Sequence, residues 1–163
     1  MNNLLIRKAE SRDLKTLLRF EQGVVEAERA FDPTLAAAGV QYYDLEHLLT
    51  SPAAELAVAE LHGQVVGSGY ARLETSKPYL KHPRHAYLGF MYVLPEHRGQ
   101  GVNQLLLAHL RQWVRNQGVF EMRLEVYEHN ASAIKSYEKT GFVRHMVEMR
   151  LALSTTDYGP EPA

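Results

Sequence analysis

The most constraining feature of the sequence is a continuous apolar run that leads through a basic, glycine-rich turn into an amphipathic helix. Residues 86–93 are almost all apolar, as expected for a strand buried on both faces. The turn reads Pro-Glu-His-Arg-Gly-Gln-Gly over residues 95–101, and apolar side chains recur at helical spacing from Val102 to Val114. Because the first N–H groups of such a helix have no backbone partner, they can hold a phosphate.

The residues of this turn suit a diphosphate ester. Gly99 and Gly101 let the backbone approach a ligand without a side chain in the way, and Arg98 adds a positive charge with a planar fork of donors. The turn is not a Walker loop, because no Gly-Lys-Ser/Thr follows, and it lacks the third glycine of a dinucleotide fingerprint. From the turn alone, a loop that merely uses glycine to reverse direction fits equally well.

The remaining pattern divides the chain into short strands and helices. Apolar or alternating runs predict strands, and leucine spacing with capping residues predicts helices. The expected strands cover residues 4–6, 55–61, 65–73, 86–93 and 120–127, with a last strand or strands within 143–153, and the expected helices start after Ser11, at 44–49, at 102 and after Asn130. Short connections favour antiparallel pairing in the first part of the sheet, and the long helical crossover favours a parallel neighbour.

The chain is expected to form one domain. Its 163 residues suffice for a single core, which we place at residues 1–153, and the polar, proline-bearing residues 154–163 predict a mobile tail. Gly67, Gly69 and Gly89 interrupt expected strands and indicate a bulge or a close backbone approach.

Composition excludes several classes of function. The net charge of −1 gives no overall bias toward nucleic acid or an anionic membrane, so neither is expected as a partner. The absence of cysteine excludes disulfides, thiolate metal sites and a cysteine nucleophile. His82 and His85 lack a third ligand nearby, so no metal is expected. With no signal-like or membrane-spanning run, we expect a cytoplasmic protein.

Two separated motifs together resemble the GNAT superfamily of acyl-CoA-dependent N-acyltransferases. The first is the turn from Arg98, which matches the family's phosphate motif except that Asn103 occupies a position where glycine or alanine is usual. The second comprises Leu124-Glu125-Val126, Asn130, Ala133, Tyr137-Glu138-Lys139 and Gly141-Phe142. The resemblance spans residues 56–142. It implies an α/β (α+β) fold with a central mixed, mostly antiparallel sheet, flanking helices and a splayed strand pair at the cofactor site.

The resemblance also implies which residues bind acetyl-CoA as co-substrate. Backbone groups of the strand before the turn would bond the pantetheine arm, and Asn130 would bond it too, besides capping its helix. The remaining contacts would be to the pyrophosphate. By this resemblance, the cofactor-binding residues are Met91, Tyr92, Val93, Arg98, Gly99, Gln100, Gly101, Val102, Asn103, Gln104 and Asn130.

Two catalytic roles follow from the same resemblance. Tyr137 would be the general acid that protonates the departing thiolate, although its position on an apolar helix face alone favours a core tyrosine. Glu125 is the leading candidate base, since it matches the catalytic glutamate of the subgroup that acetylates protein N-termini. A surface or ion-paired strand residue is an equally good interpretation of Glu125. Glu74 is the second choice, and Tyr87 and His85 come after it.

The expected reaction is direct transfer of an acetyl group to a primary amine, on a small molecule or a peptide. Neither a cysteine nor an evident serine–histidine arrangement supports a covalent intermediate. An acidic acceptor cleft would attract a cationic amine, and an acidic solvated surface is the alternative. The acidic residues concerned are Glu21, Glu26, Glu28, Asp32, Asp44, Glu46 and Glu55. A non-catalytic acyl-CoA sensor remains the alternative function, and a homodimer through the final strands is compatible with the resemblance.

Overall fold

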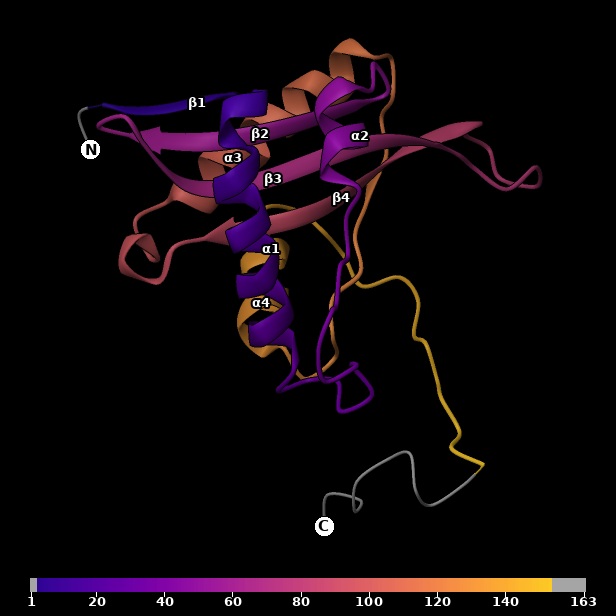
Figure 1. The fold of residues 1–163 in the computed structure, drawn as a ribbon. Coiled ribbons are helices and arrows are strands. Elements are labelled where there is room, and N and C mark those ends of the chain that lie inside the picture. The colour runs from indigo at the N-terminus through magenta and orange to yellow at the C-terminus, as the bar shows by residue number, and fades with distance from the viewer. Residues whose placement is uncertain (1–2, 154–163) are drawn as a thin grey trace.

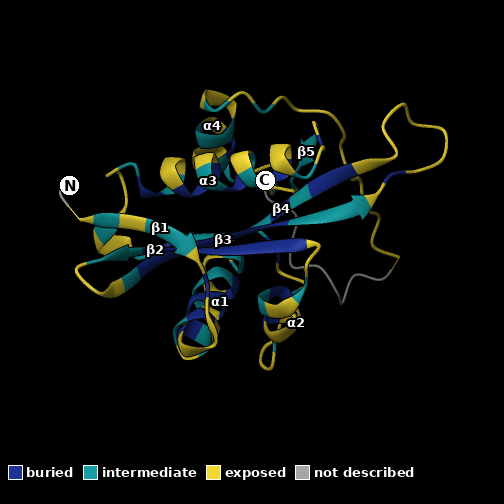
Figure 2. Cartoon of the chain, turned by 90° about the horizontal axis from the view of Figure 1, so that it is seen from above, coloured by how far each residue is buried: buried dark blue, intermediate teal, exposed yellow. Residues whose placement is uncertain are grey.

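The computed structural model describes residues 3–153, which form one twisted sheet with helices on both faces (Figure 1). Helices α1 and α2 cover one face, and α3 and α4 cover the other (Figure 2). The elements are β1 (Leu4–Lys8), η1 (Ser11–Asp13), α1 (Leu14–Glu28), α2 (Leu45–Thr50), β2 (Ala54–Leu61), β3 (Gln64–Thr75), β4 (Arg84–Val93), η2 (Pro95–His97), α3 (Val102–Asn116), β5 (Met122–Arg123) and α4 (Ala131–Lys139).

The sheet has the expected mixed, mostly antiparallel topology. Its strands follow chain order from β1 to β5, and every neighbouring pair through β4 is antiparallel. Helix α3 then carries the chain back, so β5 lies parallel to β4, with Ala86 opposite Met122 and Tyr87 opposite Arg123. A helical crossover of this length is what parallel pairing requires. The predicted fold class is confirmed.

A bulge in β4 lies directly after Gly89. Tyr70 pairs with Gly89 and Ser68 pairs with Tyr92, so two residues of β4 face the single intervening Gly69 of β3. Phe90 takes a φ of 55°, which turns the strand locally. The bulge presses Met91 against Gly69, where an added Cβ would overlap the Met91 sulfur. The bulge expected from the strand glycines is therefore present, and Gly69 supplies the close approach.

The core has two halves, one on each face of the sheet. Successive residues of β2 alternate between them: Leu56 and Val58 pack under α1 and α2, whereas Ala57 and Ala59 pack under α3. Leu106 and its periodic neighbours along α3 are almost completely buried against the second half. Truncation of a buried leucine to alanine costs about 2–5 kcal/mol. This packing fixes α3, and with it the turn that precedes it.

Three predicted elements differ in the structure. Ser11 does not cap a helix; Glu10 and Asp13 form a reciprocal capping box around η1 instead. The strand expected at residues 120–127 pairs only over Met122–Arg123, because β4 and β5 then diverge. Residues 143–153 form no strand, because no strand of the described chain runs beside them. The predicted mobile tail at 154–163 lies outside the described residues. None of the helices within residues 3–153 has both the length and the apolar character needed to cross a bilayer.

Candidate active site

The glycine-rich turn presents an uncapped helix N-terminus. Gly99 and Gly101 take φ values of 72° and 82°, in the left-handed region that favours glycine. Gly101 is the N-cap of α3, and no side chain caps that end. A Cβ added at Gly99 would meet no atom within 4 Å, so the space beside the turn is open to a ligand. First-turn N–H groups and open space together form a site that can hold an anion.

Arg98 braces the turn against the end of β4. Its Nε donates to the Val93 carbonyl oxygen at 2.9 Å, and its guanidinium lies 5.7 Å from the Tyr92 ring centre. Its terminal nitrogens make no hydrogen bond within residues 3–153 and carry the charge toward solvent. Arg98 therefore stabilises the turn through its Nε, and its terminal guanidinium nitrogens remain available to a ligand beside the helix N-terminus.

The strands next to the turn splay apart. β4 and β5 pair at only two positions, after which β4 continues to Val93 without a partner on that side. The edge of β4 that faces β5 therefore has no strand partner within the described chain from Leu88 onward, although the Val93 carbonyl oxygen accepts from Arg98 Nε. Met91, Tyr92 and Val93 belong to this open edge, and they lead directly into the glycine-rich turn. An extended polar chain could bond to this edge while a phosphate occupies the turn.

Asn130 begins helix α4, which carries Tyr137. The Asn130 side-chain oxygen accepts a hydrogen bond from the Ala133 N–H at 3.2 Å, so Asn130 is the N-cap of α4. Ile134 anchors the helix in the core, and the Tyr137 ring packs edge-on against Phe142 with centroids 5.7 Å apart. The capping role of Asn130 is confirmed, whereas its contact with pantetheine stays a prediction.

The environment of Tyr137 keeps its phenol protonated. Burial, with a further contribution from the Glu28 charge, raises the pKa of Tyr137 to about 12. Its hydroxyl makes no hydrogen bond within the described part of the chain. A neutral phenol without an internal partner can donate to an anion that develops nearby, such as a thiolate.

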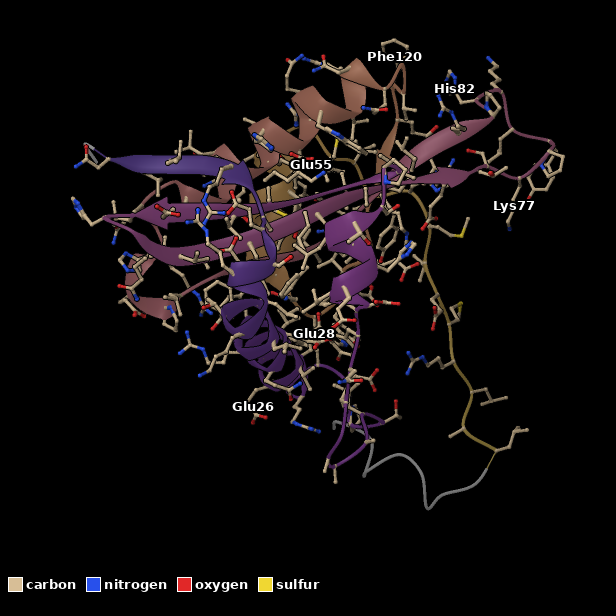
Figure 3. The ribbon with its side chains drawn as sticks, turned by 45° about the horizontal axis from the view of Figure 1, so that its top comes forward. Glu26, Glu28, Glu55, Lys77, His82 and Phe120 are labelled. Carbon is tan, nitrogen blue, oxygen red and sulfur yellow. The ribbon has the colours of Figure 1, made fainter. Side chains whose placement is uncertain are left out.

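Glu28 is the last residue of α1, and its charge contributes to the raised pKa of Tyr137 (Figure 3). Its carboxyl is half-buried, and this burial raises its pKa; the Tyr42 hydroxyl acts in the opposite direction, and the Asp32 charge adds to the increase. The buried Tyr42 oxygen has no hydrogen-bond partner within residues 3–153. A half-buried acid beside a candidate general acid is a typical feature of a functional site.

Asp32 ties the loop after α1 to the chain after β5. It accepts a hydrogen bond from the Tyr127 hydroxyl at 3.2 Å and lies 3.4 Å from an Arg150 nitrogen. The Phe31 and Tyr127 rings stack, with centroids 6.1 Å apart. Hydrogen bonds from Thr34, assisted by the Arg150 charge, lower the pKa of Asp32. These contacts group two aromatic rings and a carboxylate at the loop after α1.

The candidate base Glu125 is exposed and lies near the buried Tyr70 and the partly buried Tyr87. Burial raises the pKa of Tyr87 and of Tyr70, and the negative charge of Glu125 adds to both increases. Glu74, the second candidate, is engaged: it forms an ion pair with Arg72 and lies 3.4 Å from His85. Of the two, Glu125 has the freer carboxylate.

The chain matches a family of known proteins over most of its length. The profile of the acetyltransferase (GNAT) family matches residues 16–142. The chain belongs to the GNAT acetyltransferase family. The acetyltransferase is 29% identical over 147 residues to thialysine N-epsilon-acetyltransferase of Bos taurus. The aligned region covers 85% of this chain and 83% of that relative. It is also 34% identical over 67 residues to streptothricin acetyltransferase of Streptomyces lavendulae. This aligned region covers 41% of this chain and 35% of that protein.

Solved structures share the fold of this acetyltransferase. A tetramutant of a Bacillus halodurans protein superposes with a TM-score of 0.82 at 18% identity, covering 91% of this chain and 99% of that one. A predicted acetyltransferase of Clostridium acetobutylicum, solved with acetyl-CoA, has a TM-score of 0.68 at 18% identity, covering 95% of this chain and 98% of that one. At these identities the likeness concerns the fold alone.

Two of the acidic residues expected in the acceptor cleft of the acetyltransferase, Glu21 and Glu55, make internal contacts instead. Glu21 is 1% exposed and accepts hydrogen bonds from the backbone N–H groups of Tyr42 and Tyr43, at 2.7 and 2.9 Å. Glu55 pairs with His109 at 2.8 Å on the α3 side of the sheet. Glu26 points to solvent, and Glu28 points inward (Figure 3). Of this set, Glu28 contributes to the raised pKa of Tyr137, and Asp32 accepts a hydrogen bond from Tyr127.

The structure also contains a serine–histidine pair that the sequence reading did not anticipate. Ser76 Oγ and His85 Nδ1 lie 2.8 Å apart at the base of the β3–β4 hairpin, and Glu74 lies on the other side of the histidine ring. Ser76 is only 6% exposed, which keeps its hydroxyl away from substrates. The pairing of Glu74 with His85 across the hairpin is the signal that could have found this cluster. Within residues 3–153, no group of three His, Asp or Glu side chains is placed to hold a metal ion.

Proposed function

We propose that this acetyltransferase moves the acetyl group of acetyl-CoA directly onto a primary amine, on a small molecule or a peptide, with both substrates bound together. The observation that carries the proposal is the uncapped α3 N-terminus beside the splayed edge of β4. This arrangement fits a diphosphate joined to an extended amide-containing arm, as in coenzyme A. The Clostridium acetobutylicum relative solved with acetyl-CoA supports the same co-substrate.

In the proposed reaction the amine nitrogen attacks the thioester carbonyl. The new C–N bond forms, the C–S bond breaks, and the sulfur leaves as a thiolate that takes the proton of the Tyr137 phenol. Since a phenol of pKa about 12 stays neutral at physiological pH, it is able to donate. The attacking amine loses its proton to Glu125, directly or through water. Solvent then restores the proton of Tyr137.

The acceptor side of the opening favours a cationic amine. Glu28 and Asp32 place two carboxyl groups near Tyr137 and Tyr127, and Asp32 also pairs with Arg150. A positively charged amine would be drawn to these carboxyl groups. The relatives named for thialysine and streptothricin support a small-molecule acceptor.

A thiol-release assay with acetyl-CoA tests the proposal. The acceptor panel comprises polyamines, aminoglycosides, amino acids with a second amino group, and N-terminal peptides. Tyr137→Phe should lose most of the turnover and keep coenzyme binding, whereas the matched control Tyr79→Phe, at the exposed hairpin tip, should keep both. Coenzyme binding without turnover of any amine would favour the alternative, a non-catalytic acyl-CoA sensor.

A further inference from the structure

The Tyr92 side chain lies between helix α1 and the glycine-rich turn. Tyr92 is the second-to-last residue of β4, and its ring packs against the half of the core that α1 and α2 cover (Figure 2). The Phe20 ring of α1 contacts it, with centroids 4.9 Å apart. The Arg98 guanidinium lies over the same ring, 5.7 Å from its centre. The ring therefore connects the first long helix to the arginine of the turn.

A glycine in the middle of α1 makes room for this ring. Gly23 lies well inside the helix, where glycine is less favourable than alanine. A Cβ added at Gly23 would lie 2.6 Å from the Tyr92 hydroxyl oxygen and 2.8 Å from two carbons of its ring. Because non-bonded carbon atoms prefer separations of about 3.5–4.0 Å, only a residue without a side chain lets the ring lie this close to the helix.

The ring also borders open space. Phe20 and Tyr92 line a hollow of about 760 Å³ between α1, the start of β3 and η2. A ring without its contacts to α1 would be free to turn into this space, and the guanidinium would then lose the aromatic face beneath it. The contacts with Phe20 and Gly23 are therefore what keeps the ring in place.

The Arg98 guanidinium has two contacts that set its direction. Its Nε donates to the Val93 carbonyl oxygen at 2.9 Å, and the Tyr92 ring supports the rest of the planar group. Its terminal nitrogens make no hydrogen bond among residues 3–153 and remain available to a phosphate. A guanidinium that is already held in place binds a phosphate more tightly than a mobile one, because less side-chain freedom is lost on binding.

We propose that the Tyr92 side chain is a positioning residue for acetyl-CoA: Phe20 and Gly23 hold its ring, and the ring holds the Arg98 guanidinium at the diphosphate. The inference rests on the proposed binding of acetyl-CoA at the turn. It gives the Tyr92 side chain a role besides the backbone contacts expected with the pantetheine arm. It also makes the affinity for the coenzyme depend on α1, the helix that ends at Glu28 on the acceptor side.

Calorimetric titration with acetyl-CoA tests the role of the ring. Tyr92→Leu should bind acetyl-CoA roughly threefold to tenfold more weakly, because the guanidinium loses its aromatic support. Tyr92→Phe keeps the ring and should restore most of the affinity. Because Tyr92 acts through Arg98, the double variant Tyr92→Leu, Arg98→Gln should bind as Arg98→Gln does alone. Losses that simply add in the double variant would overturn the proposal.

Gly23→Ala tests the same inference with Tyr92 and Arg98 both unaltered. Alanine favours the helix, whereas its Cβ displaces the Tyr92 ring, so acetyl-CoA should bind severalfold more weakly with an unchanged circular dichroism spectrum. This loss should disappear in the Arg98→Gln background. Glu26→Ala, at an exposed position of the same helix, is the matched control and should bind as the unaltered protein does.

The outcomes separate this inference from the proposed function. Unchanged affinity in Gly23→Ala or in Tyr92→Leu, beside normal binding by the unaltered protein, overturns the positioning role and leaves the proposed function standing. No saturable binding of acetyl-CoA by the unaltered protein overturns the proposed function, and the positioning role with it.

Discussion

Burial and the charge of Glu28 together hold the pKa of Tyr137 at about 12, although Glu28 ends the first long helix and Tyr137 lies on the last one. Their proximity joins the acceptor side of the opening to the coenzyme side. The acid attracts a cationic amine, and the same charge helps to keep the phenol protonated for the departing sulfur.

The titration of Tyr137 should respond to Glu28. Glu28→Gln removes one of the two causes of the raised pKa, so the pKa of Tyr137 should fall, while burial keeps it above the usual value of about 10. The difference between the ultraviolet pH titrations of each protein and its Tyr137→Phe counterpart isolates this phenol. An identical Tyr137 titration in the two backgrounds would contradict the coupling.

The same pKa shift predicts a loss of stability at high pH. The folded-state pKa of Tyr137 lies above that of the unfolded chain, so its contribution is complete below pH of about 10 and is lost as the pH rises toward 12. Chemical unfolding at a series of pH values should show a smaller loss over this range for Tyr137→Phe than for the unaltered protein. Equal losses of stability in both proteins would contradict the conclusion that the surroundings of Tyr137 keep its phenol neutral.

Glu28→Gln should also weaken acceptor binding. We expect kcat/KM for cationic amines to fall roughly tenfold, which corresponds to about 1.4 kcal/mol, because the acceptor loses one attractive charge. The affinity for acetyl-CoA should not change. Glu26→Gln is the matched control, since Glu26 lies on the same helix and points to solvent. A similar effect of both substitutions would indicate that the acceptor responds to the overall negative charge of this region and not to a local contact with Glu28.

Glu21 should matter for stability and not for substrate binding. Its carboxylate accepts two backbone N–H groups in a buried place, so Glu21→Ala leaves both donors without a partner. Loss of these charge-assisted bonds should reduce the free energy of unfolding by about 2–4 kcal/mol. Urea unfolding measures the loss, and KM values of the folded variant should remain close to those of the unaltered protein. A variant of normal stability with an altered KM would reverse this assignment.

Much of the fold could be read from the sequence because its causes are local. The periodic leucines of α3, including Leu106 and Leu110, fix the helix and its buried face. The positive φ angles of Gly99 and Gly101 likewise follow from residues that tolerate such angles. Asn130 was identified as a cap for the same reason: its bond to Ala133 spans one helical turn.

The sequence-based predictions that were wrong concern features that depend on contacts between distant parts of the chain. The sequence shows that Glu21 is acidic, but only the fold brings Tyr42 and Tyr43 to its carboxylate. Similarly, the strand pattern of residues 143–153 is plain in the sequence, whereas the strand itself needs an edge that the described chain does not place beside it. Burial and partners of this kind cannot be derived from spacing alone.

Calorimetric titration with acetyl-CoA tests whether the turn at Arg98 holds the diphosphate of the coenzyme. The unaltered protein should bind one acetyl-CoA per chain. Arg98→Gln should bind it severalfold more weakly and with less dependence on salt, because a free guanidinium fork at the site is lost. Arg115→Gln, an exposed arginine at the other end of α3, is the control and should bind as the unaltered protein does. No saturable binding, or equal binding by the Arg98→Gln variant, would contradict the account.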